Sequence, residues 1–302
     1  MSQLSSQSQK VTIGIPTYVG GPSLVKTVES LLSSEYRDFR IIVSVDGKKL
    51  DPEIKAAITK DPRVEVIENE VRRGQVGGIR QILSLSFDQD IVILAQDDLI
   101  FNRQSVGEII ASFSDPKVTM VTATADILPP TNLFENIMWV GFEILKTIER
   151  GWNQGDNYLN ASGRCIAFRK GMIKNIFEEI QEEVISCDAH FYFINKQFGG
   201  TFVRSPGTYW FRRPKNLTEH LKQSKKYQNV AAELYKFRRI DAFREYAIPL
   251  SVKIKAALIG FLKYPLTAPL YYTVLAYTRL HGDKTFKKAT RFWDTDESTK
   301  EI

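Results

Sequence analysis

ILAQDDLIF, residues 93–101, joins a strand-like run of apolar residues to two adjacent carboxylates. The run begins at Ile91 as IVILA, and short β-branched runs with apolar residues at consecutive positions are typical of strands buried on both faces. It ends abruptly in Gln96, Asp97 and Asp98. Carboxylates this close repel each other unless a cation or hydrogen-bond donors stabilise them. The stretch therefore predicts a buried sheet with a polar site where a strand ends.

Other segments of the chain repeat this strand pattern. Four of them have the same apolar, β-branched character: VTIGI (11–15), IIVSV (41–45), VEVI (64–67) and VTMVT (118–122). Between them lie segments whose apolar residues recur at helical spacing, and a further helix around 173–180 precedes a strand-like TFV at 201–203. Alternating strands and helices predict an α/β fold, with a mostly parallel sheet flanked by helices. In such sheets, ligands bind at the carboxyl ends of the strands.

Polar residues follow each predicted strand in the first hundred residues. They are Pro16-Thr17-Tyr18, Asp46-Gly47, Glu68-Asn69 with Arg72-Arg73-Gly74 shortly after, and Gln96-Asp97-Asp98. In a parallel sheet these groups gather at one edge, where a hard divalent cation and a phosphate-bearing substrate would satisfy them. The alternative is that Asp and Asn simply end strands and start turns. That alternative explains any single strand end well, but it explains the whole set less well.

The composition limits the class of protein. The chain has 302 residues, is 43% hydrophobic and carries a net charge of +6. These values exclude wholesale disorder and suit nucleic acid, anionic lipid or phosphate-bearing small molecules as partners. Two cysteines and three histidines provide neither a disulfide framework nor a zinc site, and they fit a reducing compartment. Neither PTYVGG nor RRGQVGG matches G-x-G-x-x-G, and no P-loop is present, so a Rossmann dehydrogenase and a P-loop ATPase are unsupported.

Taken in order, these motifs resemble those of the family 2 glycosyltransferases. The matching segments are I-P-T-Y (15–18), Asp46, N-E-V-R-R-G (69–74), Q-D-D (96–98), S-G-R-C-I-A-F-R (162–169), C-D-A-H-F (187–191) and Q-S-K-K-Y (223–227). The resemblance covers roughly residues 11–230 and implies an inverting enzyme with the GT-A fold and a nucleotide-sugar donor. The last segment is similar to the Q-x-x-R-W motif of membrane-associated polysaccharide and glycolipid synthases. The chain departs from the family pattern at Val19, Gln96, Cys187, Lys226 and Tyr227, which stand where Asn, the first acid of D-x-D, Glu, Arg and Trp are usual.

The resemblance also implies roles for individual residues. Asp98 is the expected ligand of a divalent cation, Mn²⁺ or Mg²⁺, and Asp188 is the expected general base for the acceptor hydroxyl. The expected nucleotide-sugar-binding residues are Pro16, Thr17, Tyr18, Asp46, Asn69, Arg73, Asp97, Gln223, Lys226 and Tyr227. The expected acceptor-side residues are Ser162, Gly163, Arg164 and Trp210. Alternatives stay open for three positions: Asp188 as a helix cap, the helix around Gln223 as a solvated amphipathic helix, and Trp210 as a core aromatic residue.

The two ends of the chain are expected to lie outside a catalytic domain at 11–240. Residues 1–10 lack the apolar core of a signal peptide and are expected to form a disordered tail. Residues 241–302 are apolar and basic, but YPLTAPLYYTVLAYT (264–278) is shorter than the ~20 residues that span a bilayer and contains two prolines. Lysines interleaved with apolar residues instead predict interfacial helices on an anionic membrane surface. The alternative is that this segment packs on the catalytic domain or forms a dimer contact.

The sequence thus predicts a cytoplasmic hexosyltransferase bound peripherally to the cytoplasmic face of a membrane. It would move a sugar, from a donor expected to be a UDP-sugar, with inversion, to a lipid-linked or growing glycan acceptor in polysaccharide biosynthesis of the cell envelope. One alternative is a nucleotidyltransferase, which would want a basic glycine-rich loop where PTYVGGPS lacks Lys and Arg. Another is a nucleic-acid-binding module that uses the basic stretch 204–239, although such a module has no need of acids at every strand end. No nucleic-acid partner is expected.

Overall fold

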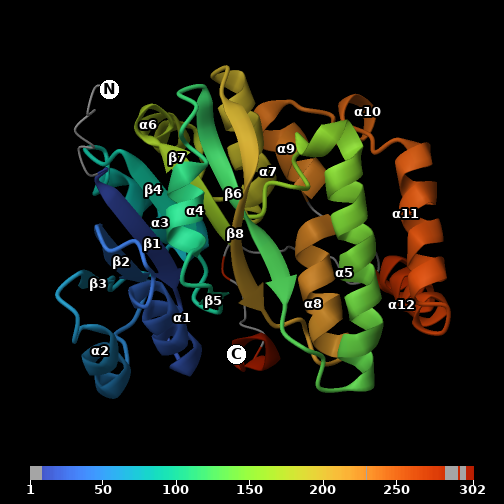
Figure 1. Cartoon of the computed structure of the whole chain (residues 1–302), viewed down its shortest axis with the longest axis horizontal. Coiled ribbons are helices and arrows are strands. Elements are labelled where there is room, and N and C mark those ends of the chain that lie inside the picture. The colour runs from blue at the N-terminus through green and yellow to red at the C-terminus, as the bar shows by residue number, and fades with distance from the viewer. Residues whose placement is uncertain (1–8, 229, 283–291, 293–296) are drawn as a thin grey trace, which may run out of the picture.

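The computed structural model describes residues 9–228, 230–282, 292 and 297–302, without the side chains of 225–228, 243, 245, 282 and 297. The predicted tail at 1–10 therefore lies almost wholly outside the described residues. An eight-stranded sheet forms the centre of the molecule, in the order β3-β2-β1-β4-β7-β6-β8-β5 (Figure 1). Its strands are β1 (Val11–Thr17), β2 (Phe39–Val45), β3 (Val64–Glu68), β4 (Ile91–Ala95), β5 (Ile100–Phe101), β6 (Val118–Ile127), β7 (Cys165–Arg169) and β8 (Thr201–Phe211).

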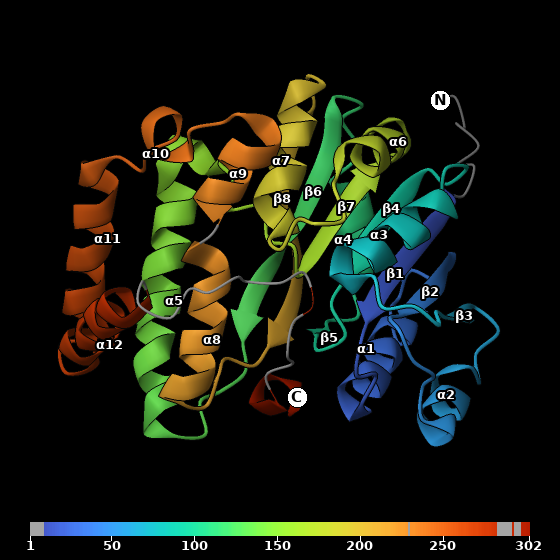
Figure 2. The same cartoon turned by 180° about the vertical axis from the view of Figure 1, so that it is seen from behind.

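Helices cover both faces of this sheet and extend beyond one end of it (Figure 2). They are α1 (Pro22–Leu32), α2 (Pro52–Ile58), α3 (Gly74–Ser84), α4 (Ser105–Ala111), α5 (Leu133–Gly151), α6 (Lys170–Glu179), α7 (Cys187–Gln197), α8 (Leu217–Gln228), α9 (Val230–Arg238), α10 (Ala242–Glu245), α11 (Leu250–Lys263) and α12 (Thr267–Gly282). Short 3-10 helices span Trp152–Gly155 (η1) and Glu297–Lys300 (η3). The predicted α/β fold is confirmed.

The first half of the sheet is parallel, as predicted, and the second half is mixed. Strands β3, β2, β1 and β4 run in one direction, with Val11 opposite Phe39 and Ile91. Strand β7 runs against both of its neighbours, β4 and β6. It was not predicted as a strand. The reversal places its first residue, Cys165, opposite the last residue of β4, Ala95. The loop before β7 therefore reaches the edge where the parallel strands end.

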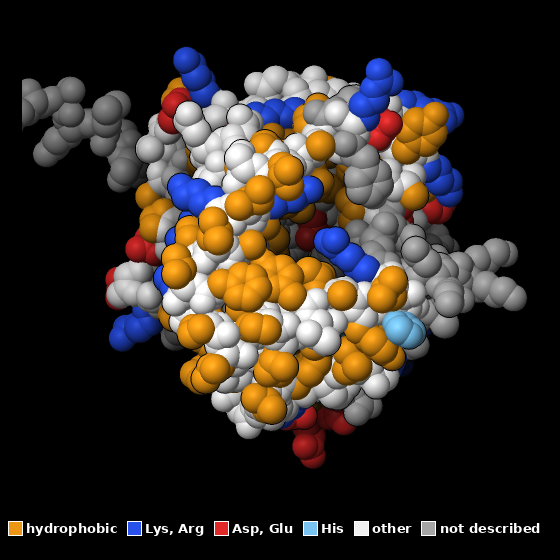
Figure 3. All heavy atoms as spheres, turned by 90° about the vertical axis from the view of Figure 1, so that its right-hand side faces the viewer, with side chains coloured by type: hydrophobic (Ala, Val, Ile, Leu, Met, Phe, Trp, Pro, Cys, Tyr) orange, Lys and Arg blue, Asp and Glu red, His pale blue; other side chains and the backbone are white. Residues whose placement is uncertain are grey.

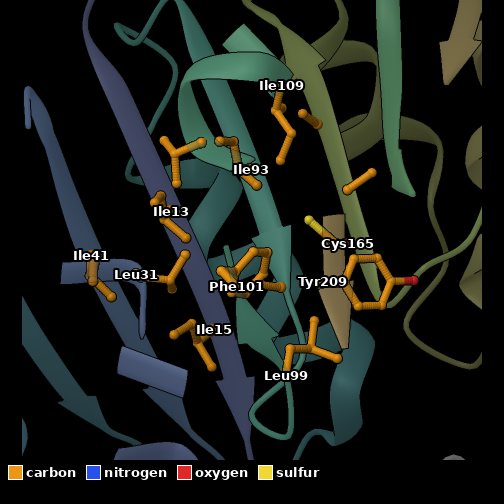
Figure 4. Packing of buried hydrophobic residues seen from close by; sticks show 14 of the residues in the cluster. Ile13, Ile15, Leu31, Ile41, Ile93, Leu99, Phe101, Ile109, Cys165 and Tyr209 are labelled. Atoms are coloured by element: carbon orange, nitrogen blue, oxygen red, sulfur yellow. The ribbon is translucent and has the colours of Figure 1, made fainter. Parts of the chain in front are cut away.

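Consecutive residues of the central strands enter two different hydrophobic cores. In β4, Ile93 packs into the core under α1 and α4, whereas Leu94 packs into the core under α3, α6 and α7. Figure 4 shows part of the first core, in which Ile13, Ile41 and Ile93 point toward one side of the sheet. A strand with apolar neighbours on both faces needs apolar residues at every position. This double burial is why the predicted strands read as uninterrupted apolar runs.

The helices α11 and α12 pack on α5 beyond the sheet. A small third cluster, centred on Val140, Ile144, Ala256 and Ala268, joins them. Small residues allow this close approach, because a Cβ atom on Gly141 would overlap the ring of Tyr271. Among the residues that the structure describes, none of the helices is both long and apolar enough to cross a membrane.

Candidate active site

Asp46 ties the end of β2 to the start of α3. Its carboxylate accepts hydrogen bonds from the backbone N–H groups of Arg73 (2.6 Å) and Gly74 (3.0 Å), and Arg72 Nε lies 3.7 Å from Oδ2. A carboxylate at a helix N-terminus is stabilised by the exposed N–H groups and by the helix dipole. Asp46 thereby fixes the loop that contains Arg72 at the sheet edge.

Arg72 and Tyr18 form a flat surface beside Asp46. The guanidinium carbon of Arg72 lies 3.7 Å from the centroid of the Tyr18 ring, and Lys48 Nζ lies 5.0 Å from the same centroid. Cations over an aromatic face are attracted by its quadrupole. A planar base could stack here while the cations face phosphate. Sequence reasoning selected Tyr18 and Arg73 but gave no role to Arg72.

The side chains of two predicted donor residues, Asn69 and Arg73, bind residues other than Tyr18 and Arg72. Asn69 Nδ2 donates to the carbonyl of Val45 (2.8 Å) and to Gln81 Oε1 (2.9 Å), which braces the end of β2 against α3. The side chain of Arg73 pairs with Glu182. Pro16 lies near the end of β1 and close to α3. A Cβ atom added to Gly78 of α3 would be 3.2 Å from the Cβ atom of Pro16.

Asp97 and Asp98 are both buried, but their partners differ. Asp97 Oδ2 accepts a hydrogen bond from Thr17 Oγ1 at 2.5 Å, and its other oxygen pairs with Lys300. Asp98 Oδ2 lies 3.4 Å from Lys300 Nζ. Within the described part of the chain, Asp98 Oδ1 has no hydrogen-bond partner, and Arg164 Nη1 approaches it only to 3.9 Å.

Gln96 binds Arg164, the cation on the Oδ1 side of Asp98. Arg164 Nη1 donates to Gln96 Oε1 at 2.9 Å, and the backbone N–H of Gln96 donates to the Arg164 carbonyl at 2.9 Å. A neutral amide accepts from the guanidinium without adding a further negative charge to the edge. Arg164 therefore holds the loop before β7 against the end of β4.

The donor set at Asp98 fits a hard cation. A buried carboxylate oxygen without a hydrogen-bond partner is a suitable ligand, since Mg²⁺ and similar ions take one or two protein carboxylates and complete their shell with phosphate oxygens and water. Among the described residues, no group of three or more His, Cys, Asp or Glu side chains is arranged to hold a metal. A cation here would therefore depend on the phosphates of a substrate.

Asp188 lies in the first turn of α7, facing the loop before β7. A Cβ atom on Gly163 would overlap its carboxylate, so the glycine permits the close approach of loop and acid. Burial raises the pKa of Asp188, although the backbone N–H of Gly163 donates to the charged form and lowers it in part. Ser186, not Asp188, occupies the N-cap position of α7. The carboxylate of Asp188 thus faces Gly163, and Asp188 is not the N-cap of α7.

Glu233 of α9 supports the segment that precedes Asp188. Its buried carboxylate accepts hydrogen bonds from the backbone N–H groups of Ile185 (3.0 Å) and Ser186 (3.2 Å). Sequence reasoning missed this residue. The available signal was one acid on an apolar helix face, three residues after Val230 and four before Phe237.

The remaining predicted residues lie at the margins of the site. Ser162 Oγ is 3.1 Å from the hydroxyl of Tyr209, and Trp210 is half-buried on β8 opposite Ile100. Gln223 is half-buried on α8 and, in the part of the chain that is described, makes no hydrogen bond to Asp97 or Asp98. The side chains of Lys226 and Tyr227 lie outside the described residues, so the role of α8 stays a prediction.

Neither the buried histidine nor the cysteine beside Asp188 has the properties of a reactive group. Burial and the nearby charge of Arg238 lower the pKa of His190 to about 3, so the ring is neutral. Burial and the neighbouring Asp188 raise the pKa of the Cys187 thiol. A thiol that stays protonated is a weak nucleophile.

Comparison with known proteins identifies the family to which this chain belongs. The family model for glycosyl transferase family 2 matches residues 12–177, and the chain therefore belongs to that family. Among solved structures, the chain is similar to the mannosyltransferase PcManGT from Pyrobaculum calidifontis in complex with GDP-Man and Mn²⁺, with a TM-score of 0.58 and 16% identity over 90% of this chain and 76% of that one. It is also similar to S. aureus TarS, with a TM-score of 0.52 and 14% identity over 90% of this chain and 54% of that one. A search of curated proteins finds no match. These likenesses confirm the predicted GT-A fold.

Proposed function

We propose that this glycosyltransferase moves a hexose with inversion from a nucleotide sugar to a glycan or lipid-linked acceptor. The observation that carries the proposal is the loop before β7. Arg164 contacts Gln96 and stands 3.9 Å from Asp98, while Gly163 packs on Asp188. One loop therefore lies between a candidate donor carboxylate and a candidate base, which is the arrangement that a single displacement requires.

In this proposal the donor nucleotide binds along the carboxyl ends of β1, β2 and β4. The base stacks beside Tyr18 and Arg72, and Asp46 and Asp97 bind the nucleoside by hydrogen bonds. Thr17 holds Asp97 in place through the 2.5 Å hydrogen bond described above. Arg164 faces the leaving diphosphate, where its charge stabilises the negative charge that develops as the sugar departs.

A divalent cation at Asp98 fits the same arrangement. When bound, Mn²⁺ or Mg²⁺ would act as a Lewis acid on the diphosphate of the donor. The fit rests on the unpartnered Oδ1 atom of Asp98, and the likeness to PcManGT, whose structure contains Mn²⁺, supports it. Thr17 holds Asp97, and Gln96 holds Arg164, which stands 3.9 Å from Asp98.

Asp188 would take the proton from the attacking hydroxyl of the acceptor. General-base assistance of this kind contributes about 10²–10⁴ in rate. The raised pKa of Asp188 makes its carboxylate a stronger base than an exposed aspartate. Glu233 holds the backbone before Asp188, and Gly163 leaves room for the carboxylate to face the site.

The donor is tested with purified full-length chain and a panel of UDP-glucose, UDP-N-acetylglucosamine and GDP-mannose. With Mn²⁺, we expect release of the nucleoside diphosphate from one UDP-sugar, and loss of that release in EDTA that excess Mn²⁺ restores. Release from GDP-mannose alone would overturn the UDP assignment. No release from any donor, with or without an added glycan acceptor, would contradict the proposed function.

We further propose that α11 and α12 lie on an anionic membrane surface on its cytoplasmic face. Figure 3 shows hydrophobic side chains gathered on the face of the molecule that carries these helices. Its most exposed members include Leu262 (82%) and Leu266 (85%). Lys253, Lys255 and Lys263 lie on the same helix as Leu262, and basic residues beside an apolar face favour anionic lipid. Membrane binding would bring the site to a lipid-linked acceptor.

Sedimentation with phosphatidylglycerol-containing vesicles tests the membrane proposal. Leu262→Glu combined with Leu266→Glu should lower the bound fraction several-fold, because each change removes apolar contact and adds repulsion from the anionic surface. Leu85→Glu, at an exposed position (45%) beyond α3, is the matched control and should bind as the unchanged chain does. Equal binding by all three proteins would contradict the proposal.

A further inference from the structure

The segment Ser298–Ile302 lies in the same site as the two adjacent carboxylates. Lys300 pairs with Asp97 and stands 3.4 Å from Asp98 Oδ2. Ser298 and Thr299 are buried. Lys300 is thus a cation that contacts both carboxylates.

Contacts on both sides of Lys300 hold this segment in place. Ser298 Oγ accepts a hydrogen bond from the backbone N–H of Lys215 at 3.1 Å and donates to Glu219. Arg212 Nε donates to the Glu301 carbonyl at 2.8 Å, and Lys215 pairs with the Glu301 carboxylate. Several specific contacts therefore direct Lys300 to the carboxylates, so its position does not depend on charge attraction alone.

Phe292 also lies beside the proposed donor surface. The centroid of the Phe292 ring is 5.1 Å from the guanidinium carbon of Arg72, which also stacks on Tyr18. Phe292 thus lies where the proposed nucleobase would stack, and Lys300 lies where the proposed cation would bind. Phe292 and Lys300 therefore lie beside the two places that the proposed nucleobase and cation would occupy.

Lys300 and a divalent cation exclude each other at this position. A cation bound to Asp98 Oδ1 would sit about 2.0–2.6 Å from that oxygen. The Lys300 ammonium already stands 3.4 Å from Oδ2 of the same carboxylate. The two positive charges would then lie within a few ångströms of each other in a buried setting, where repulsion is strong. Binding of one therefore disfavours binding of the other.

We propose that Ser298–Ile302 is an internal ligand of the donor site, with Lys300 in the place of the divalent cation, and that it must be displaced before donor and cation bind. The inference rests on the proposed function, because that function defines the competing ligand. When a segment of the same chain occupies the site, the apparent dissociation constant of a ligand equals its intrinsic value divided by the fraction of molecules in which the site is open. Donor binding is therefore coupled to release of this segment.

Binding of Mn²⁺ alone tests the proposal without any measurement of catalysis. Free Mn²⁺ is quantified by its electron paramagnetic resonance signal in titrations of the full chain. Lys300→Ala should bind Mn²⁺ about five- to thirty-fold more tightly, the range that loss of one partly buried ion pair supports. Lys222→Ala, at an exposed position of α8, removes the same charge and should bind as the unchanged chain does.

A second measurement follows the segment itself. Addition of Mn²⁺ with UDP should increase hydrogen exchange of the amides of residues 298–302, because displacement exposes them to water. Equal Mn²⁺ affinity in Lys300→Ala and the unchanged chain would overturn the proposal, as would weaker affinity in the variant or unchanged exchange on addition of Mn²⁺ and UDP. Tighter Mn²⁺ binding by Lys300→Ala in a protein that releases no nucleoside diphosphate from any donor would uphold this proposal and overturn the proposed function.

Discussion

Replacement of Asp188 by asparagine is expected to lower the rate of sugar transfer by about 10²–10⁴ while donor binding is retained. Asparagine preserves the size and the hydrogen bond from Gly163, but it accepts no proton from the acceptor hydroxyl. The measurement is transfer to an acceptor, compared with nucleotide binding by calorimetry. Loss of both binding and transfer would show that Asp188 belongs to the donor site and that the base is elsewhere.

The same residue predicts the acid side of the pH profile. Burial raises the pKa of Asp188, so the carboxylate takes up a proton at a higher pH than an exposed aspartate. Transfer should therefore fall as the pH drops through this raised pKa, because the protonated acid no longer accepts a proton. The fall should be absent from the residual activity of Asp188→Asn.

Gly163→Ala should also lose transfer, because the added Cβ atom displaces the Asp188 carboxylate. Gly171→Ala is the control, since Gly171 has open space around it.

Replacement of Asp98 by alanine is expected to abolish measurable Mn²⁺ binding and to lower donor turnover by about 10²–10³. The variant removes the buried, unpartnered oxygen that the cation would use, and it leaves Thr17 and Asp97 intact. Asp90→Ala is the matched control. Asp90 lies just before β4, at the end of that strand opposite to Asp98. Turnover by Asp98→Ala that equals that of the unchanged chain would remove the cation from the mechanism.

The parallel half of the sheet and its polar edge could be predicted from the sequence, because their signals are local. A strand buried on both faces must be apolar at every position, and its end must return to polar residues, so IVILA followed by Gln96 marks both features at once. The direction of β7 could not be predicted in this way. CIAFR is as apolar as the parallel strands, and the pattern of a buried strand is the same in either direction.

Contacts between distant segments account for the other residues that the sequence did not indicate. Glu233 acts on backbone N–H groups of Ile185 and Ser186, which carry no side-chain signal. Lys300 pairs with an aspartate 203 positions away in the chain, and nothing in its own neighbourhood marks it. The residue types within the site could be read from the sequence, whereas the groups that hold them in place required the fold.

The reversed direction of β7 separates the two halves of the site in a way that matters for redesign. In the parallel half, the residues that reach the edge follow their strands, as Asp46 and Asp98 do. In the other half they precede a strand, as Ser162–Arg164 do, and they join the first half along the β4–β7 pairing and through the contact of Arg164 with Gln96. The loop before β7 can therefore be redesigned while β1, β2 and β4 keep their sequences, provided that Arg164 keeps its contact with Gln96. A scaffold divided in this manner would let one side of the proposed site change while the other side is kept.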